Sequence, residues 1–309
     1  MKRISEKSRH LAKINLHRII KLFLFKMRMT LKKNRMKKLL ILFIIVVIVS
    51  SFSQKEITWV AIGDSITYLN DHPNETGNRI TKGYMTRVIE KLPHIKYVNQ
   101  GHNGWTSGSI AENIEKIAIP PADVYSVLLG TNDWWQGRSI GTLADYKNNT
   151  GNTTLSGAYR TIINKIRSLN SEAKIILITP MQRGDFIYIG NMKNNAYGSY
   201  QEKKGQTLAQ FAGAIDSIAR YEHFVLVDLY QKRSLRQEKM VKYKRLKDPN
   251  SGNYKNYPYP SFIGIPLNPE TDEYPYPTDA IDMTYDGLHP SDKGYSVIAN
   301  MLVKELKRF

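Results

Sequence analysis

Three residues stand where their side chains could carry out nucleophilic chemistry. Gly63-Asp64-Ser65 follows the apolar run 57–62, which predicts a buried strand that ends in a tight turn bearing the serine. Asp286 precedes His289 by three residues, so one turn can present both side chains. A serine hydroxyl is a poor nucleophile near neutral pH unless a base lies within hydrogen-bond reach, and imidazole titrates in that range. Open α/β sheets bind ligands at the carboxyl ends of their strands, so Ser65 lies where a reactive group is expected.

Two further polar segments follow predicted strands and should meet the same edge of the sheet. They are Asn99-Gln100-Gly101-His102-Asn103-Gly104-Trp105-Thr106 and Gly130-Thr131-Asn132-Asp133. Both contain amide N–H groups, which are the donors that an oxygen gaining negative charge requires. Gly, Asn, Asp and Ser are also ordinary turn residues, so each segment taken alone could be no more than a turn. Only the segments together predict a site.

The elements that must position these residues can be read from hydrophobic periodicity. From Gln54 onward short apolar runs alternate with helical patterns, as they do in βαβ units. After the first run, strands are predicted at 95–98, 124–129, 174–179 and 224–228, and helices at 84–92, 109–118, 155–169, 207–221 and 291–309. A basic helix is predicted over 234–246. The stretch 248–282 is rich in Pro, Tyr and Asn and lacks periodicity, which indicates a lid or a binding surface.

No internal repeat or linker interrupts this pattern, so residues 54–309 are predicted to form one domain. The expected fold is α/β: a three-layer α/β/α sandwich around a five-stranded parallel sheet, with helices on both faces.

Taken together, the four segments resemble the GDSL or SGNH hydrolase family of esterases and lipases. The resemblance rests on Gly63-Asp64-Ser65, Asn99-x-Gly101-x-x-Gly104-x-Thr106, Gly130-Thr131-Asn132-Asp133 and Asp286-Gly287-Leu288-His289-Pro290, which occur in the family's order. It spans nearly all of residues 54–309. Ile66 stands where the family's name implies Leu, which is a conservative apolar change. The resemblance implies the flavodoxin-like strand order of that family.

The resemblance also implies roles for individual residues. Ser65 would be the nucleophile, His289 its general base, and Asp286 the carboxylate that orients the imidazole. The backbone N–H groups of Ser65 and Gly104 and the side-chain amide of Asn132 would form the oxyanion hole. Losing one such donor typically costs about 10²–10³ in rate.

Aromatic residues near these segments bear on the substrate. Asp64, Trp134 and Trp135 are candidate substrate contacts, and His102 either touches substrate or packs in its loop. Aromatic side chains also recur late in the chain, at Tyr254, Tyr257, Tyr259, Phe262, Tyr274, Tyr276 and Tyr285. Such rings can stack on sugars, wall an acyl pocket, or simply pack the loop against the domain.

The expected activity is that of a serine esterase which removes small acyl groups, such as acetyl, from carbohydrate through an acyl-enzyme. A lipase, lysophospholipase or thioesterase of the same family, or a non-catalytic glycan-binding relative, is the alternative. A flavodoxin-like cofactor binder is disfavoured because no glycine pattern for a phosphate-binding loop follows the first strand. No cofactor and no metal site is expected: the chain lacks cysteine and the His-x-His or His-Glu-x-x-His spacing. The expected partner is a small-molecule or glycan ester.

The amino terminus carries most of the chain's charge of +18. Residues 1–38 contain 14 Lys or Arg residues and one Glu, a net +13, which leaves +5 for the rest and removes most support for a nucleic-acid surface. The apolar run 39–49 is shorter than the ~20 residues of a spanning helix, and Ser51-Phe52-Ser53 offers small residues for cleavage. Residues 1–53 are therefore predicted to be a basic leader with a signal peptide or an uncleaved signal anchor, with translation starting at Met1 or Met36. The protein is expected to be exported, with membrane contact only through this segment.

Overall fold

The computed structural model describes residues 21–22, 25–26, 29 and 55–309. Contacts divide the chain into two units, Met1–Lys55 and Glu56–Phe309. Of the described residues of the first unit, 21–22, 25–26 and 29 are helical and Lys55 is not. The predicted leader and signal segment lies almost wholly outside the described residues. Within the described part of the chain, no helix combines the length and the apolar character needed to cross a membrane.

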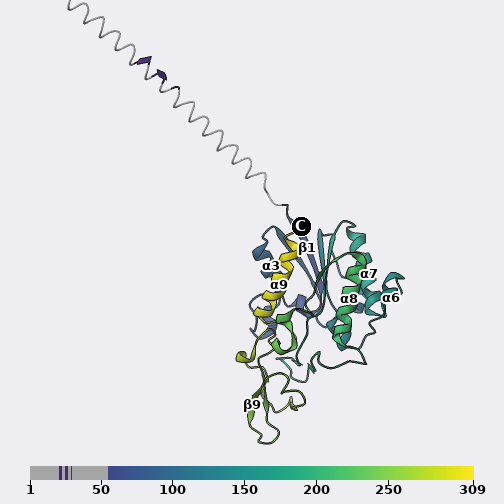
Figure 1. Ribbon diagram of the computed structural model, residues 1–309, viewed down its shortest axis with the longest axis vertical. Helices are drawn as coiled ribbons and strands as arrows, with labels where there is room; N and C mark the ends of the chain where they lie inside the picture. The colour runs from purple at the N-terminus through teal and green to yellow at the C-terminus, as the bar shows by residue number, and fades with distance from the viewer. Residues whose placement is uncertain (1–20, 23–24, 27–28, 30–54) are drawn as a thin grey trace, which may run out of the picture. The chain divides into compact units, whose positions relative to one another are not determined.

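A parallel sheet of five strands forms the centre of the second unit (Figure 1). Its strands are β1 (Ile57–Gly63), β2 (Ile95–Gly101), β3 (Val124–Leu128), β4 (Lys174–Ile178) and β7 (Val225–Val227). The strand order is β2-β1-β3-β4-β7, and each neighbouring pair is parallel. This architecture confirms the predicted fold class and its flavodoxin-like order.

Helices pack on both faces of the sheet. The α-helices are α2 (Ser65–Tyr68), α3 (Tyr84–Lys91), α4 (Ser107–Glu112), α5 (Thr131–Trp135), α6 (Leu143–Lys147), α7 (Leu155–Leu169), α8 (Leu208–Glu222) and α9 (Asp292–Leu306). Single turns of 3₁₀-helix are η1 (Pro73–Thr76), η2 (Arg233–Leu235), η3 (Gln237–Lys239) and η4 (Thr278–Ala280). Helices α3 and α9 cover one face, and α6, α7 and α8 lie on the other (Figure 1).

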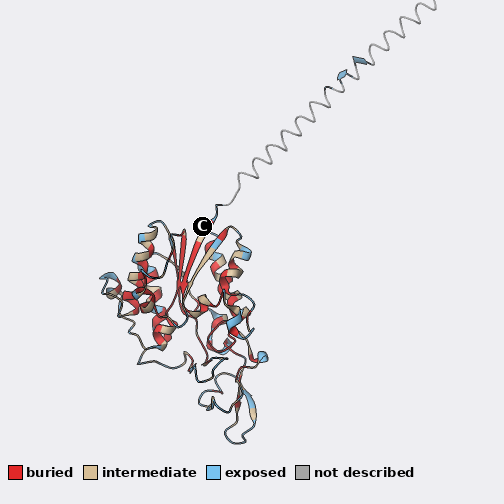
Figure 2. Ribbon diagram, turned by 180° about the vertical axis from the view of Figure 1, so that it is seen from behind, coloured by how far each residue is buried: buried red, intermediate tan, exposed pale blue. Residues whose placement is uncertain are grey.

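The alternation of side chains along the strands explains why both faces are covered. In β1, Trp59 and Ala61 join the apolar core on the side of α3 and α9, whereas Val60 and Ile62 join the core on the side of α7 and α8. All four are fully buried, and β1, β3 and β4 are buried through most of their length, whereas the edge strands β2 and β7 are mostly half-buried (Figure 2). A strand buried on both faces is apolar throughout, and this is the pattern that the sequence shows.

The register of the neighbouring strands β2, β1 and β3 brings their carboxyl ends to one edge of the sheet. Gly63 at the end of β1 lies opposite Gly101 of β2 and Leu128 of β3. The segments that follow these three residues carry Ser65, Gly104 and Asn132. The sheet therefore places side chains distant in sequence at the same edge.

A smaller lobe extends beyond this edge (Figure 1). It contains the antiparallel pairs β5 (Phe186–Ile187) with β6 (Asn195–Ala196) and β8 (Lys244–Lys247) with β9 (Tyr254–Tyr257). Its own apolar cluster consists of buried Ile187, Val241, Leu246, Phe262 and Tyr276. The prediction of a helix over 234–246 is wrong. The segment forms η2, η3 and the start of β8, where burial alternates with the period of a strand.

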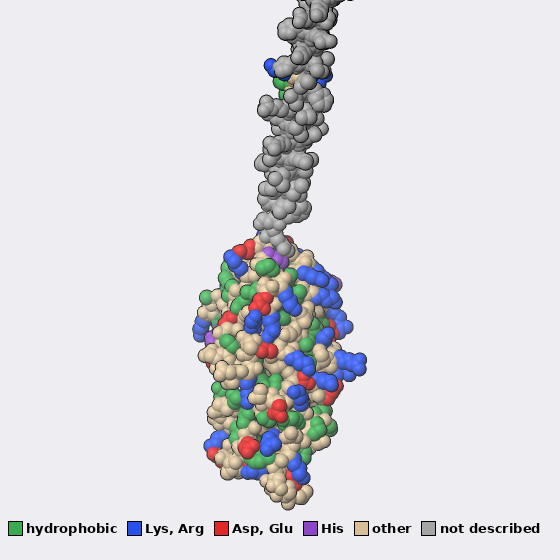
Figure 3. All heavy atoms as spheres, turned by 90° about the vertical axis from the view of Figure 1, so that its left-hand side faces the viewer, with side chains coloured by type: hydrophobic (Ala, Val, Ile, Leu, Met, Phe, Trp, Pro, Cys, Tyr) green, Lys and Arg blue, Asp and Glu red, His purple; other side chains and the backbone are tan. Residues whose placement is uncertain are grey.

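Charged side chains of both signs lie on the surface of the second unit. On the face that α3 and α9 cover, Lys and Arg side chains lie among Asp and Glu side chains (Figure 3).

Candidate active site

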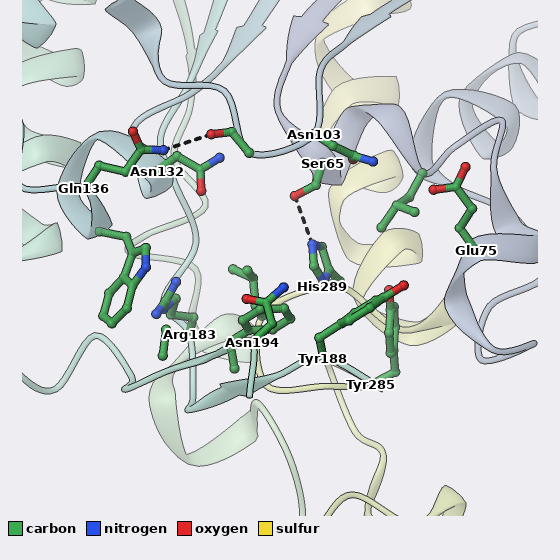
Figure 4. Close-up of a pocket in the computed structure, with 16 residues that line it drawn as sticks. Ser65, Glu75, Asn103, Asn132, Gln136, Arg183, Tyr188, Asn194, Tyr285 and His289 are labelled. Carbon is green, nitrogen blue, oxygen red and sulfur yellow. Dashed lines mark hydrogen bonds between the residues drawn. The ribbon is translucent and has the colours of Figure 1, made fainter. Parts of the chain in front are cut away.

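Ser65, His289 and Asp286 form a continuous hydrogen-bonded chain at the carboxyl edge of the sheet (Figure 4). The Ser65 Oγ lies 2.9 Å from His289 Nε2, although the two residues are 224 positions apart. His289 Nδ1 lies 2.7 Å from Asp286 Oδ2. Asp286 is buried and His289 is 8 % exposed, so water has access to the serine end of the chain but not to the carboxylate end.

Local contacts fix the Asp286–His289 turn. The second carboxylate oxygen of Asp286 accepts hydrogen bonds from the backbone N–H groups of Leu288 at 3.0 Å and His289 at 2.7 Å. Gly287 has a φ of +90°, and a Cβ there would lie 1.9 Å from the Asp185 carbonyl oxygen, so only glycine fits. The imidazole also packs edge-on against Phe186 and stacks on Tyr285.

Ser65 is the first residue of α2, and Asp64 caps that helix. The Asp64 side chain accepts a hydrogen bond from the Ile66 N–H at 3.0 Å. Burial raises the pKa of Asp64 to about 6, while the Ile66 hydrogen bond and the nearby His289 act in the opposite direction. The capping bond sets the turn that directs the Ser65 hydroxyl toward His289.

Backbone and amide donors lie beside the serine. Among the hydrogen bonds of the described residues, neither the Ser65 N–H nor the Gly104 N–H has a partner. Gly104 has a φ of +73°, and no heavy atom lies within 4 Å of a Cβ placed there. The Asn132 side-chain nitrogen donates to the Trp105 carbonyl at 3.0 Å and lies 3.5 Å from Asp64 Oδ2, at the outer limit of a hydrogen bond. An amide nitrogen carries two hydrogens, so one of them is available to a bound group.

A buried carboxylate holds the Gly104 segment in place. Asp133, the neighbour of Asn132, accepts hydrogen bonds from the Ser107 N–H at 2.9 Å and the Ser107 hydroxyl at 2.5 Å. Arg138 lies 3.4 Å from the same carboxylate. Asp133 therefore ties the loop after β2 to the helix after β3, which keeps the candidate donors in a fixed relation.

These groups open onto one cavity of about 380 Å³. This volume lies at the small end of the range of about 300–1,000 Å³ for ligand pockets. The lining residues are Ser65, Leu69, Glu75, Asn103, Gly104, Asn132, Trp135, Gln136, Arg183, Phe186, Tyr188, Asn194, Ala196, Tyr285, Leu288 and His289. The lining combines aromatic, amide and charged groups around the serine (Figure 4).

Some of the expected substrate contacts do not reach this cavity. Trp134 is fully buried, and its indole N–H donates to the Gln206 carbonyl at 3.0 Å, so it packs the core. Asp64 is 3 % exposed and acts as a helix cap. His102 stacks on Trp105 within its own loop. Of the three predicted contacts Asp64, Trp134 and Trp135, only Trp135 lines the cavity.

The aromatic residues of the late loop mostly pack the lobe. Phe262 and Tyr276 are buried in its apolar cluster, and Tyr257, Tyr259 and Tyr274 pack against that cluster. Tyr285 alone of the late aromatic residues lines the cavity. Packing was one of the three interpretations left open by the sequence.

Sequence analysis missed the segment that closes one side of the cavity. The residues that line it there are Arg183, Phe186, Tyr188, Asn194 and Ala196. All follow β4, between the predicted strand 174–179 and the predicted helix 207–221. Their place after the carboxyl end of a central strand was the one signal available.

A doubly covered parallel sheet with a serine, a histidine and an aspartate in hydrogen-bond contact at its carboxyl edge defines a hydrolase of α/β/α architecture. A sequence profile of the GDSL-like Lipase/Acylhydrolase family matches residues 61–297, and the chain belongs to this family. No curated protein gives a significant match.

One solved structure supports the same assignment, and others are similar at lower identity. A possible lipase from Chitinophaga pinensis is 62% identical, with a TM-score of 0.81 over 82% of this chain and 98% of that chain. A protein from Lactobacillus plantarum is 18% identical, with a TM-score of 0.56 over 82% of this chain and 98% of that chain, and it shares the fold. A catalytic mutant of an acetylxylan esterase from Geobacillus stearothermophilus is 19% identical over 82% of this chain and 94% of that chain. Its TM-score of 0.47 is too low to bear on function.

Proposed function

We propose that the protein is a serine esterase that hydrolyses carboxylic esters through an acyl-enzyme, with Ser65, His289 and Asp286 as its catalytic triad. The observation that carries the proposal is the Ser65 Oγ to His289 Nε2 contact of 2.9 Å, continued by the 2.7 Å contact from Nδ1 to Asp286. The cavity gives a substrate carbonyl access to the serine.

In acylation, the Ser65 oxygen attacks the ester carbonyl carbon while its proton moves to His289 Nε2. Asp286 accepts the Nδ1–H, which holds the ring in the tautomer that can take this proton and stabilises the imidazolium. The carbonyl oxygen becomes negative and accepts hydrogen bonds from the Ser65 and Gly104 N–H groups and the Asn132 amide. The tetrahedral species then collapses, His289 protonates the alcohol oxygen, and the alcohol leaves.

Deacylation repeats these steps with water in place of the alcohol. His289 removes a proton from the water, whose oxygen attacks the acyl carbon on Ser65. The same donors stabilise the second oxyanion. When it collapses, His289 returns the proton to the Ser65 oxygen, the acid leaves, and the site is restored.

The proposed substrates are esters of small acyl groups, such as acetyl, on carbohydrate. Two features support this choice: the cavity is small, and amide and charged side chains line it beside the rings of Trp135 and Tyr188. Amides and charges suit a hydroxylated ligand better than a long alkyl chain, and flat rings can stack on sugar faces.

A lipase is the second candidate. It is favoured by the 62% identity to the Chitinophaga pinensis protein, which is described as a possible lipase. The rates of hydrolysis of 4-nitrophenyl esters from acetyl to palmitoyl separate the two candidates. A maximum at acetyl supports the carbohydrate esterase, whereas a maximum at long chains overturns it in favour of a lipase.

The esterase proposal itself is tested with Ser65→Ala on 4-nitrophenyl acetate. The variant is expected to lose about 10⁶-fold in kcat, as serine hydrolases with a triad do when the nucleophile is removed. A variant that keeps the wild-type rate would eliminate the serine mechanism. Thermal melting of both proteins controls for misfolding.

A further inference from the structure

Arg183 is a buried cation in the wall of the cavity. The side chain is 1 % exposed, and its guanidinium lies 5.0 Å from the ring centre of Trp134 and 4.9 Å from that of Trp135. Its side chain makes one hydrogen bond, from Nη2 to the Tyr197 carbonyl at 2.7 Å. A guanidinium has five N–H donors, so most of its hydrogen-bonding capacity is unused.

No carboxylate is paired with this charge. Among the described residues Arg183 forms no ion pair, and its Nε is buried without a hydrogen-bond partner. The carboxylates of Asp185 and Asp286 favour the charged form of Arg183, but neither forms an ion pair with it. Asp185 pairs with Lys244 at 2.8 Å, and Asp286 contacts the His289 imidazole at 2.7 Å. A buried charge without a direct ion pair is costly, so a carboxylate that binds from the cavity would stabilise Arg183.

The packing of Arg183 explains how its side chain is held in place. It does not explain why a charged residue occupies this position instead of an apolar one. Two tryptophan rings attract a cation and keep the guanidinium plane in a fixed place. Methionine or leucine could fill the same space beside the two rings without the cost of burying a charge. Burial lowers the pKa of Arg183 to about 10, so the side chain still carries its charge at neutral pH.

The cavity is electrically polarised around the serine. Figure 4 shows Arg183 and Asn132 on one side, Glu75 on the opposite side, and Ser65 and His289 between them. Lys203 adds positive charge near Arg183, because its Nζ lies 4.1 Å from the Trp135 ring centre. A ligand with a negative group would therefore bind with that group toward Arg183 and away from Glu75.

We propose that Arg183 binds a carboxylate of the substrate, so that the preferred esters are those that carry a carboxylate close to the scissile bond. The proposal rests on the proposed esterase function and narrows its substrate class. The carboxylate can belong to the acyl group, as in a succinyl ester, or to the alcohol, as in an acetylated uronic acid. A planar guanidinium held against two aromatic rings is preorganised for a planar carboxylate.

Matched pairs of substrates distinguish the two sources. The first pair is 4-nitrophenyl hydrogen succinate and its methyl ester, which differ in charge on the acyl side. The second pair is an O-acetylated glucuronate and its methyl ester, which differ in charge on the sugar side. The wild-type enzyme is expected to favour the charged member of one pair by about tenfold to a hundredfold in kcat/KM, since this is the usual contribution of a charge-assisted hydrogen bond. No preference in either pair overturns the proposal.

Variants at Arg183 then test whether this side chain is responsible. Arg183→Met should abolish the preference, and Arg183→Lys, which keeps the charge but not the fork of donors, should retain part of it. The ratio of kcat/KM values within a pair does not depend on the fraction of folded enzyme, so a variant of low yield is still informative. Equal losses on both members of a pair would assign Arg183 a purely structural role.

Two further variants complete the test. Lys203→Gln removes another positive charge from beside Trp135. Because Lys203 does not line the cavity and is only half-buried, solvent and salt screen its charge, and the kcat/KM ratio within a pair should change by no more than about threefold. If the kcat/KM ratio of Lys203→Gln fell as far as that of Arg183→Met, the preference would come from the overall positive charge near the cavity. It would then not come from direct binding by Arg183, and the proposal would be overturned. Ser65→Ala should abolish hydrolysis of all four esters, so a failure of the esterase proposal is distinguishable from a failure of the carboxylate proposal.

Discussion

Asp286 has two functions that a single substitution can separate. One of its oxygens holds the backbone of Leu288 and His289, and the other accepts from the imidazole. Asp286→Asn keeps an oxygen for the backbone but turns an amide N–H₂ toward Nδ1. The imidazole is then expected to adopt the tautomer whose Nε2 carries the hydrogen, and it cannot take the Ser65 proton. We expect kcat to fall by about 10⁴, as in serine proteases with the corresponding change.

The measurement is kcat with 4-nitrophenyl acetate, with circular dichroism to show that the fold is kept. Asp282→Asn is the control: Asp282 lies close by in sequence, and its carboxylate binds the exposed Lys293 instead of His289. An Asp286→Asn enzyme as fast as wild type would remove Asp286 from the mechanism.

The buried carboxylate of Asp64 makes stability depend on pH. Burial raises its pKa to about 6, above the value of about 3.8 in the unfolded chain. Between these values the folded protein binds more protons than the unfolded chain, so stability falls as pH rises through this window. The difference between these two pKa values corresponds to a change of about 3 kcal/mol in the free energy of unfolding. The asparagine of the Asp64→Asn variant cannot titrate, so only wild type loses this stability as pH rises. The unfolding free energy of the variant minus that of wild type should therefore increase by up to this amount from pH 4 to pH 7.

Urea denaturation at several pH values checks this prediction. Comparing the variant with wild type cancels the contributions of all other titrating groups. If the unfolding free energies of variant and wild type changed with pH in parallel, the pKa of Asp64 would be the same in the folded and the unfolded protein, which would contradict the prediction.

Local motifs identified Ser65, His289 and Asp286, because spacing within a turn is a property of the sequence itself. The side chains around them could not be predicted in the same way. Trp134 and Trp135 are neighbours in sequence, yet the first is in the core and the second lines the cavity. Arg183 owes its burial to rings from another segment, and no local pattern records that contact.

At the scale of elements, Ser291 links the Asp286–His289 turn to α9. Its hydroxyl caps α9 by accepting from the N–H groups of Lys293 and Gly294, and it donates to the Asp282 carbonyl. Ser291→Ala removes the cap, which costs about 1 kcal/mol. For a domain of this size we expect the melting temperature to fall by about 2–4 °C.

Ser296→Ala is the matched control in the same helix. The Ser296 hydroxyl bonds back to the Asp292 carbonyl within α9 and caps nothing. Its loss should leave the melting temperature almost unchanged, since such bonds compete with the helix more than they support it. Equal melting temperatures for the two variants would contradict the capping role.

Long, strongly periodic elements were predictable, and short ones were not. The helix over 155–169 has the predicted bounds because its apolar stripe and its Thr154 cap are both visible in the sequence. Helices α2 and α5 are four and five residues long and begin at turn motifs, so they look like loops. The basic stretch 234–246 was assigned to a helix on composition, but Lys244 is buried against Asp185 and belongs to a strand.

At the scale of the whole molecule, the lobe beyond the sheet edge should unfold before the sheet. Phe262 is buried at the centre of its small cluster, and truncating a buried phenylalanine costs about 3–5 kcal/mol. That cost is large for a lobe with so few buried apolar residues. Phe262→Ala is therefore expected to open the lobe locally while the sheet stays folded.

Limited proteolysis with mass spectrometry measures this effect. New cleavage sites should appear within residues 248–272, and kcat/KM should fall because Ile187, next to the cavity residues Phe186 and Tyr188, packs on the same cluster. Phe309→Ala is the control. Because the Phe309 side chain is 40% exposed, its truncation should change neither the cleavage pattern nor kcat/KM. A single cooperative loss of the whole fold would show that lobe and sheet unfold together.

The partners in the 2.9 Å contact are 224 positions apart: Ser65 follows β1, and His289 precedes α9. A nascent chain on the ribosome, or one interrupted before residue 289, has the hydroxyl but not the imidazole. Under the proposed mechanism, a chain can become reactive only after residue 289 has been made and His289 has come into contact with Ser65. Incomplete copies of this protein should accordingly be harmless to any ester in the compartment that makes them.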